Sequence, residues 1–220
     1  MGLHLNFDLQ LDASTTVADA SAMLRALHSH AHTLPFASVS PFLSAATADS
    51  DDTRDQLASL RRWASILADP VEGDERTDRG AVDSAMGFLV YPGQGSETAW
   101  FGLMQRHDGD MRCTRWDWSA HCKTQYASLV SDVHLLTCHT SLVALLDAAI
   151  AIGLGVTVRD ETFYWDTRDT ARLLHEVHRM NSVVAAFSGK LSDMMGEEHR
   201  VVAPIFSHRR FEQLEMGDDG

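Results

Sequence analysis

Apolar and polar positions alternate from the start of the chain. Residues 3–11 carry leucine or phenylalanine at every odd position and polar side chains at every even one. Because successive side chains of a strand point to opposite faces, this pattern predicts a half-buried strand. Thr16 and Asp19 then form a capping box, and apolar residues recur at spacings of three and four. We therefore predict a helix over residues 16–32.

Strand-like patterning returns between residues 86 and 127. Apolar runs at 86–91 and 98–105 flank a glycine-containing turn, and Asp108-Gly109 is typical of a two-residue hairpin loop. We expect residues 112–118 to pair back and residues 121–127 to form a fourth strand. A shorter strand is predicted at 36–43, where Pro35 and Pro41 mark its ends. These segments predict an antiparallel meander.

Two long helices are predicted in the second half of the chain. Residues 132–152 are nearly all apolar toward their end, and Gly153 follows as a stop signal. A strand at 156–160 precedes a helix over 167–195, which Asp166 or Thr167 would cap. We expect an α+β fold, a two-layer sandwich in which three main helices cover an antiparallel sheet. It would form a single domain over residues 1–220, with an acidic, partly helical insertion at about 44–84.

Composition and charge narrow the classes of partner. The 220 residues are 45% hydrophobic and 22% charged, as in folded soluble domains. The net charge of −13 disfavours nucleic acid, whose phosphates need clustered basic side chains. We expect no membrane segment, because no run of 18 apolar residues occurs. Three cysteines without a C-x-x-C pair fit a reducing cytoplasm. Apolar surface from Trp63 or the tail would suit a homodimer.

Carboxylates and aromatic side chains crowd the junction between the predicted strand and the last helix. The segment from Asp160 through Glu161, Tyr164 and Trp165 to Asp166 lies there. A loop at the end of a strand places side chains over the sheet edge, and the free N–H groups of the next helix favour an anion. Alternatively, Tyr164 and Trp165 cover the core while Asp166 caps the helix, which is the commoner arrangement.

A second group surrounds Lys123, the only lysine before residue 190. On a strand over 121–127, His121, Lys123 and Gln125 would share one face. Lys123 could then bind a carboxylate or pair with Asp160 or Glu161, although an exposed strand face without a ligand is equally compatible. Asn181 falls in the apolar stripe of the last helix, where a buried amide needs a partner, either a neighbouring group or a ligand.

Two strings resemble an uncharacterised bacterial protein family. They are Lys-Thr-Gln-Tyr-Ala at 123–127 and Asp-Glu-Thr-Phe-Tyr-Trp-Asp-Thr-Arg-Asp at 160–169. Family members often carry glycine after the Asp-Glu pair, where this chain has Thr162 and Phe163. The resemblance covers about residues 123–170 and implies no activity or cofactor, so it marks a region of interest only.

Metal binding and nucleophilic catalysis find little support in the sequence. His134 and Cys138 are four residues apart, as are His28 and His32, which is the spacing of two helical ligands to one ion. Neither pair has the glutamate of H-E-x-x-H, and a structural zinc site needs four ligands. We assign no metal and no cofactor. The chain also lacks G-x-S-x-G, P-loop and G-x-G-x-x-G motifs, so no catalytic residue is assigned.

The leading hypothesis is a non-catalytic domain that binds a small ligand or a protein partner. Its candidate binding residues are His121, Lys123, Gln125, Asp160, Glu161, Tyr164, Trp165, Asp166 and Asn181. The alternative is an acid-base or metal-assisted hydrolase in which the Asp160 and Glu161 carboxylates act with His121 or His134. A third hypothesis, an acidic partner for a basic protein, rests on the net charge alone.

Overall fold

A computed structural model describes residues 3–12, 14–44, 82–108, 111–195 and 205. Most of the predicted insertion and of the C-terminal tail, Trp63 included, lies outside these residues. The strands are β1 (Leu5–Leu11), β2 (Ser38–Val39), β3 (Leu43–Ser44), β4 (Val82–Tyr91), β5 (Ala99–Asp108), β6 (Met111–Cys122) and β7 (Gly155–Asp160). The helices are α1 (Val17–Ala31), α3 (Asp132–Ala151), α4 (Tyr164–Thr167) and α5 (Thr170–Met195), with the 3-10 helix η2 (Gln125–Leu129).

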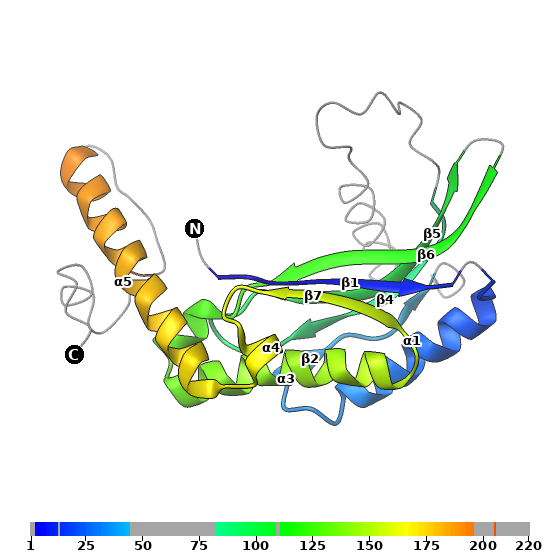
Figure 1. Cartoon of the computed structure of the whole chain (residues 1–220), viewed down its shortest axis with the longest axis horizontal. Helices are drawn as coiled ribbons and strands as arrows, with labels where there is room; N and C mark the ends of the chain where they lie inside the picture. Colours follow the sequence, from blue (N-terminus) through cyan, green and yellow to red (C-terminus); the bar gives the residue numbers. More distant parts are fainter. Residues whose placement is uncertain (1–2, 13, 45–81, 109–110, 196–204, 206–220) are drawn as a thin grey trace.

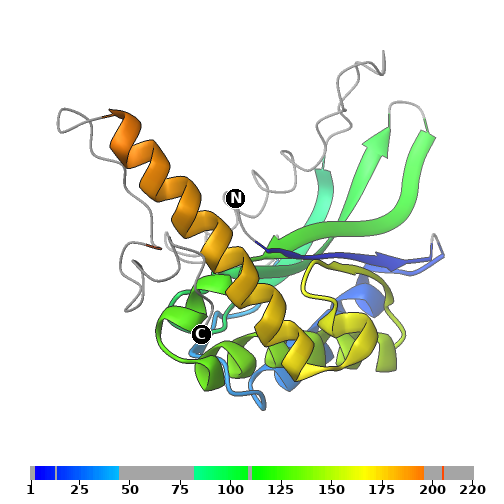
Figure 2. The same ribbon diagram turned by 60° about the vertical axis from the view of Figure 1, so that its left-hand side comes forward.

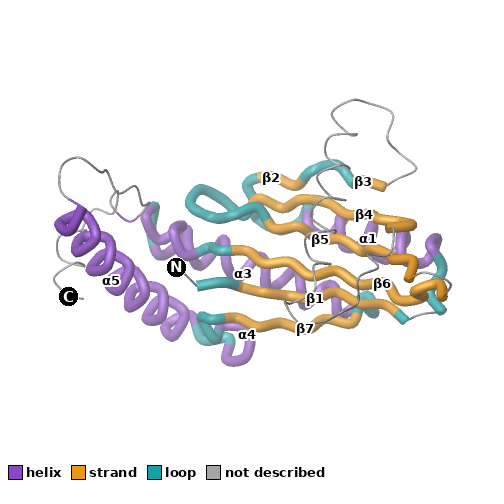
Figure 3. Tube along the Cα trace, turned by 90° about the horizontal axis from the view of Figure 1, so that it is seen from above, coloured by secondary structure: helices purple, strands orange, loops and turns teal. Residues whose placement is uncertain are grey.

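The strands form one open antiparallel sheet, which confirms the predicted α+β class. Its order is β2-β4-β5-β6-β1-β7, and β3 pairs with the other part of β4 (Figure 3). Strands β4, β5 and β6 are the expected meander. Asp108, which was expected in the two-residue loop, instead ends β5 and pairs with Met111. The N-terminal strand β1 lies between β6 and β7. It therefore links the meander to the strand that follows α3.

Two of the three main helices line one face of the sheet. Figure 1 shows α1 and α3 side by side beneath the strands. Three aromatic rings cross the buried face of the sheet: Phe7 stacks on Phe101 at a centroid distance of 4.8 Å, and Phe101 on Phe88 at 5.7 Å. The helices bury the apolar stripes that their sequence predicted, including Leu24 and Leu142. The core therefore lies between the sheet and this helical layer.

Helix α5 begins against the body and then runs away from it (Figures 1 and 2). Its first half packs Leu173 and Val177 against Ala127, Leu135 and neighbouring side chains of the body. Helix α3 is long and apolar enough to cross a membrane, but half of that stretch is buried within the protein. A central core helix has the same composition, so the length of α3 alone does not distinguish the two.

Three local predictions were wrong. Residues 121–127 are not a strand: β6 ends at Cys122, and the chain turns at Thr124 into η2. The segment 36–43 forms two short strands, with Pro41 between them. The cap of the last helix is neither Asp166 nor Thr167. Asp169 accepts hydrogen bonds from the amides of Ala171 and Arg172 at 2.9 and 3.1 Å, and so caps α5.

Candidate functional site

A buried histidine connects α3 to the end of β7. His139 donates from Nε2 to Oδ2 of Asp160 over 3.2 Å, and its Nδ1 lies 2.9 Å from the hydroxyl of Thr124. The other carboxylate oxygen of Asp160 accepts from the hydroxyl and the amide of Thr162 at 2.7 and 2.8 Å. The amide of Trp165 donates to Oδ2 over 2.9 Å. We call Thr124, His139, Asp160 and Thr162 the buried cluster.

The buried cluster is closed to solvent. The side chains of His139 and Asp160 are 1% and 0% exposed. Burial raises the pKa of Asp160, but the hydrogen bond and charge of His139, together with the bonds from Thr162, outweigh it and lower the pKa to about 2. Hydroxyl, imidazole and carboxylate follow each other as in a nucleophilic triad. However, Thr124 is only 3% exposed, so the cluster holds elements together and offers a substrate no access.

Gln125 and Asn181 belong to a second internal network. Oε1 of Gln125 accepts from the amide of Leu3 over 2.9 Å, and its Nε2 donates to Oδ1 of Asn181 over 2.8 Å. The amide of Asn181 donates in turn to the hydroxyl of Ser128 at 3.0 Å. Gln125 and Asn181 are each 1% exposed. Asn181 therefore ties α5 to η2 and, through Gln125, to the segment before β1.

The aromatic candidates pack on the body. Tyr164 and Trp165 are partly buried against the core, as one of the two sequence alternatives had it. The guanidinium of Arg168 lies 4.6 Å from the ring of Trp165 and is paired with Asp147 at 2.8 Å. Asp166 is exposed on α4. These side chains cover the end of the sheet.

His134 and Cys138 meet without forming a reactive pair. The thiol lies 3.6 Å from Nε2 of His134, but that nitrogen is 3.0 Å from the carbonyl oxygen of Gln94, to which it donates. A nitrogen that carries this proton is not a base for the thiol. Burial raises the pKa of Cys138, which the hydroxyl of Ser96 partly offsets. Within the described part of the chain, no three His, Cys, Asp or Glu side chains converge on a site for a metal ion.

An exposed carboxylate organises the surface near Lys123. The amide of Glu97 donates to the carbonyl of Lys123 over 2.8 Å, and the amide of Lys123 donates back to Oε2 of Glu97 over 3.0 Å. The ammonium of Lys123 lies 3.8 Å from Oε1, and Nε2 of His121 lies 3.9 Å from Oε2. Glu97 is therefore held in place from several sides while its side chain stays 45% exposed.

Beside this carboxylate lies a hollow of about 630 Å³ between the β4–β5 turn and η2. We call it the Lys123 hollow. It is lined by Gln94, Gly95, Ser96, Glu97, Lys123, Tyr126, Leu129 and Val130. Gly95 has a positive φ of 81°, and a Cβ there would overlap the Tyr126 carbonyl group, so the turn needs glycine to approach η2. Its lining combines the charged side chains of Glu97 and Lys123 with the apolar side chains of Leu129 and Val130.

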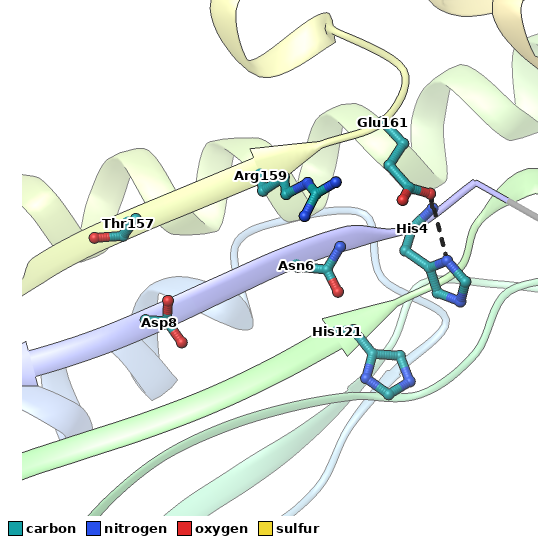
Figure 4. Close-up of a pocket in the computed structure, with 7 residues that line it drawn as sticks. All are labelled: His4, Asn6, Asp8, His121, Thr157, Arg159 and Glu161. Atoms are coloured by element: carbon teal, nitrogen blue, oxygen red, sulfur yellow. Dashed lines mark hydrogen bonds and ion pairs between the residues drawn. The ribbon is translucent and has the colours of Figure 1, made fainter. Parts of the chain in front are cut away.

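A second, shallower hollow of about 500 Å³ lies on the sheet face away from α1 and α3 (Figure 4). We call it the polar sheet hollow. Its lining residues come from β6, β1, β7 and their ends: His4, Asn6, Asp8, His121, Thr157, Arg159 and Glu161. The amide of His4 donates to Oε2 of Glu161 over 2.8 Å, and the same oxygen lies 3.4 Å from Nδ1 of the ring.

The predicted site residues thus divide among separate places. His121 and Lys123 come together at Glu97, and Glu161 lies on the same open face as His121. Asp160 pairs in register with buried Leu5, whereas Glu161 lines the open hollow, so the two carboxylates point to opposite sides of the sheet. They do not form the acid-base pair of the hydrolase alternative.

The sequence analysis did not identify His139, which is central to the buried cluster, or Glu97, which lies at the Lys123 hollow. His139 lies within the most apolar predicted helix, where a buried polar side chain needs an internal partner. Glu97 follows a turn and carries no local signal, because its partners lie about 25 residues further along the chain.

Comparison of the chain with protein-family models, with curated proteins and with solved structures gave no match.

Proposed function

We propose that this protein is a non-catalytic binding domain that holds a small zwitterion, such as an apolar α-amino acid, in the Lys123 hollow. The observation that carries the proposal is the fixed Glu97–Lys123 pair at the wall of that hollow. Its ammonium and carboxylate lie 3.8 Å apart, next to Tyr126, Leu129 and Val130. A ligand of about this size and mixed polarity suits a hollow of a few hundred Å³.

The spacing of the two charges selects the ligand class. In an α-amino acid the ammonium and carboxylate are attached to one carbon, so they can face Glu97 and Lys123 together. The side chain then extends toward Leu129 and Val130, where burying apolar surface contributes about 25 cal/mol per Å². The existing ion pair is partly exposed and worth only about 0–1 kcal/mol, so a ligand separates it at small cost.

A thermal-unfolding experiment tests the proposal. The purified protein is heated with L-leucine, with N-acetyl-L-leucine, which lacks the ammonium, and with L-leucinamide, which lacks the carboxylate. A ligand at about 100 times its Kd stabilises the native state by about 2.7 kcal/mol, which raises Tm by several degrees. We expect this rise with leucine and little change with either blocked analogue.

The matched variants are Lys123→Met and Lys190→Met, because Lys190 is the chain's other lysine and is exposed on α5. Lys123→Met should abolish the response to leucine, whereas Lys190→Met should keep it. Equal responses of the two variants would remove the hollow from consideration. So would the absence of any response of the wild-type protein to a panel of apolar α-amino acids.

A further inference from the structure

The sheet ends in a strand whose outer edge is open. Among the described strands, β7 has β1 as its one neighbour, and in Figure 3 it lies at the margin of the sheet. An edge strand presents half of its backbone N–H and C=O groups outward, where they can pair with an additional strand. This edge belongs to the strand that carries Thr157 and Arg159 of the polar sheet hollow.

Strand β7 has few of the features that protect sheet edges. Its register with β1 runs without a bulge from Asp160 opposite Leu5 to Gly155 opposite Gln10. It contains no proline, and residues 156–158 are the β-branched run Val-Thr-Val. Native edges are usually interrupted by bulges, prolines or several charges, and Arg159 is the one basic side chain on this strand. The edge is therefore suited to accept another strand.

The adjoining sheet face is acidic. Asp8 and Glu161 line the polar sheet hollow, and Asp117 shares its face because it pairs with Gln10 while Asp8 pairs with Ser119. Arg159 is the one lysine or arginine in the lining. A strand added to β7 would direct every second side chain toward this face. Lysine or arginine near Thr157 and Glu161 would face the carboxylates of Asp8 and Glu161, with Arg159 between these positions. A second copy of this chain would instead bring another net charge of −13.

We propose that β7 binds an extended, basic segment of a partner protein by strand addition. Backbone hydrogen bonds along Gly155–Arg159 hold the segment, because the carbonyl of Asp160 already accepts from the amide of Phe163. Alternate basic side chains of the segment contact Asp8 and Glu161. Strand addition supplies affinity through the backbone, and the charges of the face select the side chains.

The test measures fluorescence anisotropy with three labelled hexapeptides. One repeats Lys-Val, one repeats Lys-Pro and one repeats Glu-Val. Proline removes the backbone donor at every second residue but keeps the charge, so the second peptide separates strand addition from simple attraction. We expect Lys-Val to bind at least about tenfold more tightly than either of the others. Amide hydrogen exchange should slow in residues 155–160 and stay unchanged in α1.

Thr157→Lys is the disrupting variant, because it adds a positively charged lysine to the exposed edge strand. Ala26→Lys, on the exposed side of α1, makes the same charge change as a control. We expect about a tenfold loss of Lys-Val binding for Thr157→Lys only. Equal binding of Lys-Val and Lys-Pro, equal loss in both variants, or no Lys-Val binding would overturn the proposal. A concentration-dependent dimer that Thr157→Lys dissociates would overturn it in favour of a second copy.

Discussion

The buried cluster and the Lys123 hollow contain the same kinds of group in opposite settings. Beneath the sheet, His139 and Asp160 are at most 1% exposed and their bonding groups face one another. At the surface, Glu97 and His121 are 45% and 40% exposed and lie 3.9 Å apart. Acid and base residues are therefore a poor guide to function by themselves. Access decides which group of them can meet a ligand.

Among these predictions, removing the Asp160 carboxylate should give the largest loss of unfolding free energy. Asp160→Ala leaves His139, the Thr162 hydroxyl and two backbone amides without their acceptor in the interior. Leaving buried polar groups unsatisfied costs about 1–3 kcal/mol for each group, so the unfolding free energy should fall by about 3 kcal/mol or more. Urea unfolding measures the loss, with exposed Asp166→Ala as the control. A loss below about 1 kcal/mol for Asp160→Ala would show that the cluster does not stabilise the fold.

The Gln125–Asn181 network should show a smaller, non-additive effect. Asn181→Leu leaves the amide of Gln125 without its acceptor, which costs about 1–3 kcal/mol. Gln125→Leu removes the partner of Asn181 and of the Leu3 amide. Since the two side chains bond each other, the double variant should lose less stability than the sum of the single ones. Strict additivity in a urea double-mutant cycle would argue against the shared bond.

Lowering the pH should reduce the unfolding free energy of the protein, because Asp160 becomes protonated. Its pKa is lowered from 3.8 to about 2, so its contribution is complete above about pH 4 and is lost as the pH falls through about 2. Between pH 5 and pH 3 the wild-type protein should lose about 1 kcal/mol more unfolding free energy than Asp160→Asn. The two proteins share all other carboxylates, so the difference reports Asp160 alone. Parallel pH profiles would mean that folding does not lower the pKa of Asp160.

The smallest effects on stability are expected at the surface. His121→Ala and Lys123→Met alter partly exposed pairs with Glu97, which contribute about 0–1 kcal/mol each. Their unfolding free energies should stay within about 1 kcal/mol of the wild-type value, even though Lys123→Met should abolish ligand binding. If Lys123→Met proved as destabilising as Asp160→Ala, the contrast between the two regions would be lost.

Local patterns predicted the fold better than the site. The alternation in residues 5–11 and the apolar stripes of α1 and α3 are short-range signals, and the structure confirms the elements that they predicted. The segment around Gln125 departed from its strand-like pattern because that amide bonds both Leu3 and Asn181 in the interior. Such bonds join residues far apart in sequence, and no local period reports them.

Contacts between residues far apart in sequence also explain why the candidate site was predicted only in part. Lys123 was singled out as a rare residue, but its partner proved to be Glu97 and not an acid near residue 160. Asp160 was singled out by composition, although its position in β7 opposite Leu5 turns it toward the core. Charge and residue type thus identified groups that form specific contacts. Only the sheet register determined which of them reach solvent.

The most direct test is an NMR titration of the isotopically labelled protein with L-leucine, read from assigned backbone amides. The account predicts chemical-shift changes in residues 94–97 and 123–130, which surround the Lys123 hollow, and none at the amides of His139 and its neighbours on α3 that lie away from it. Shifts confined to other parts of the molecule, or none at saturating leucine, would contradict the claim that the open carboxylate–lysine pair forms the binding site.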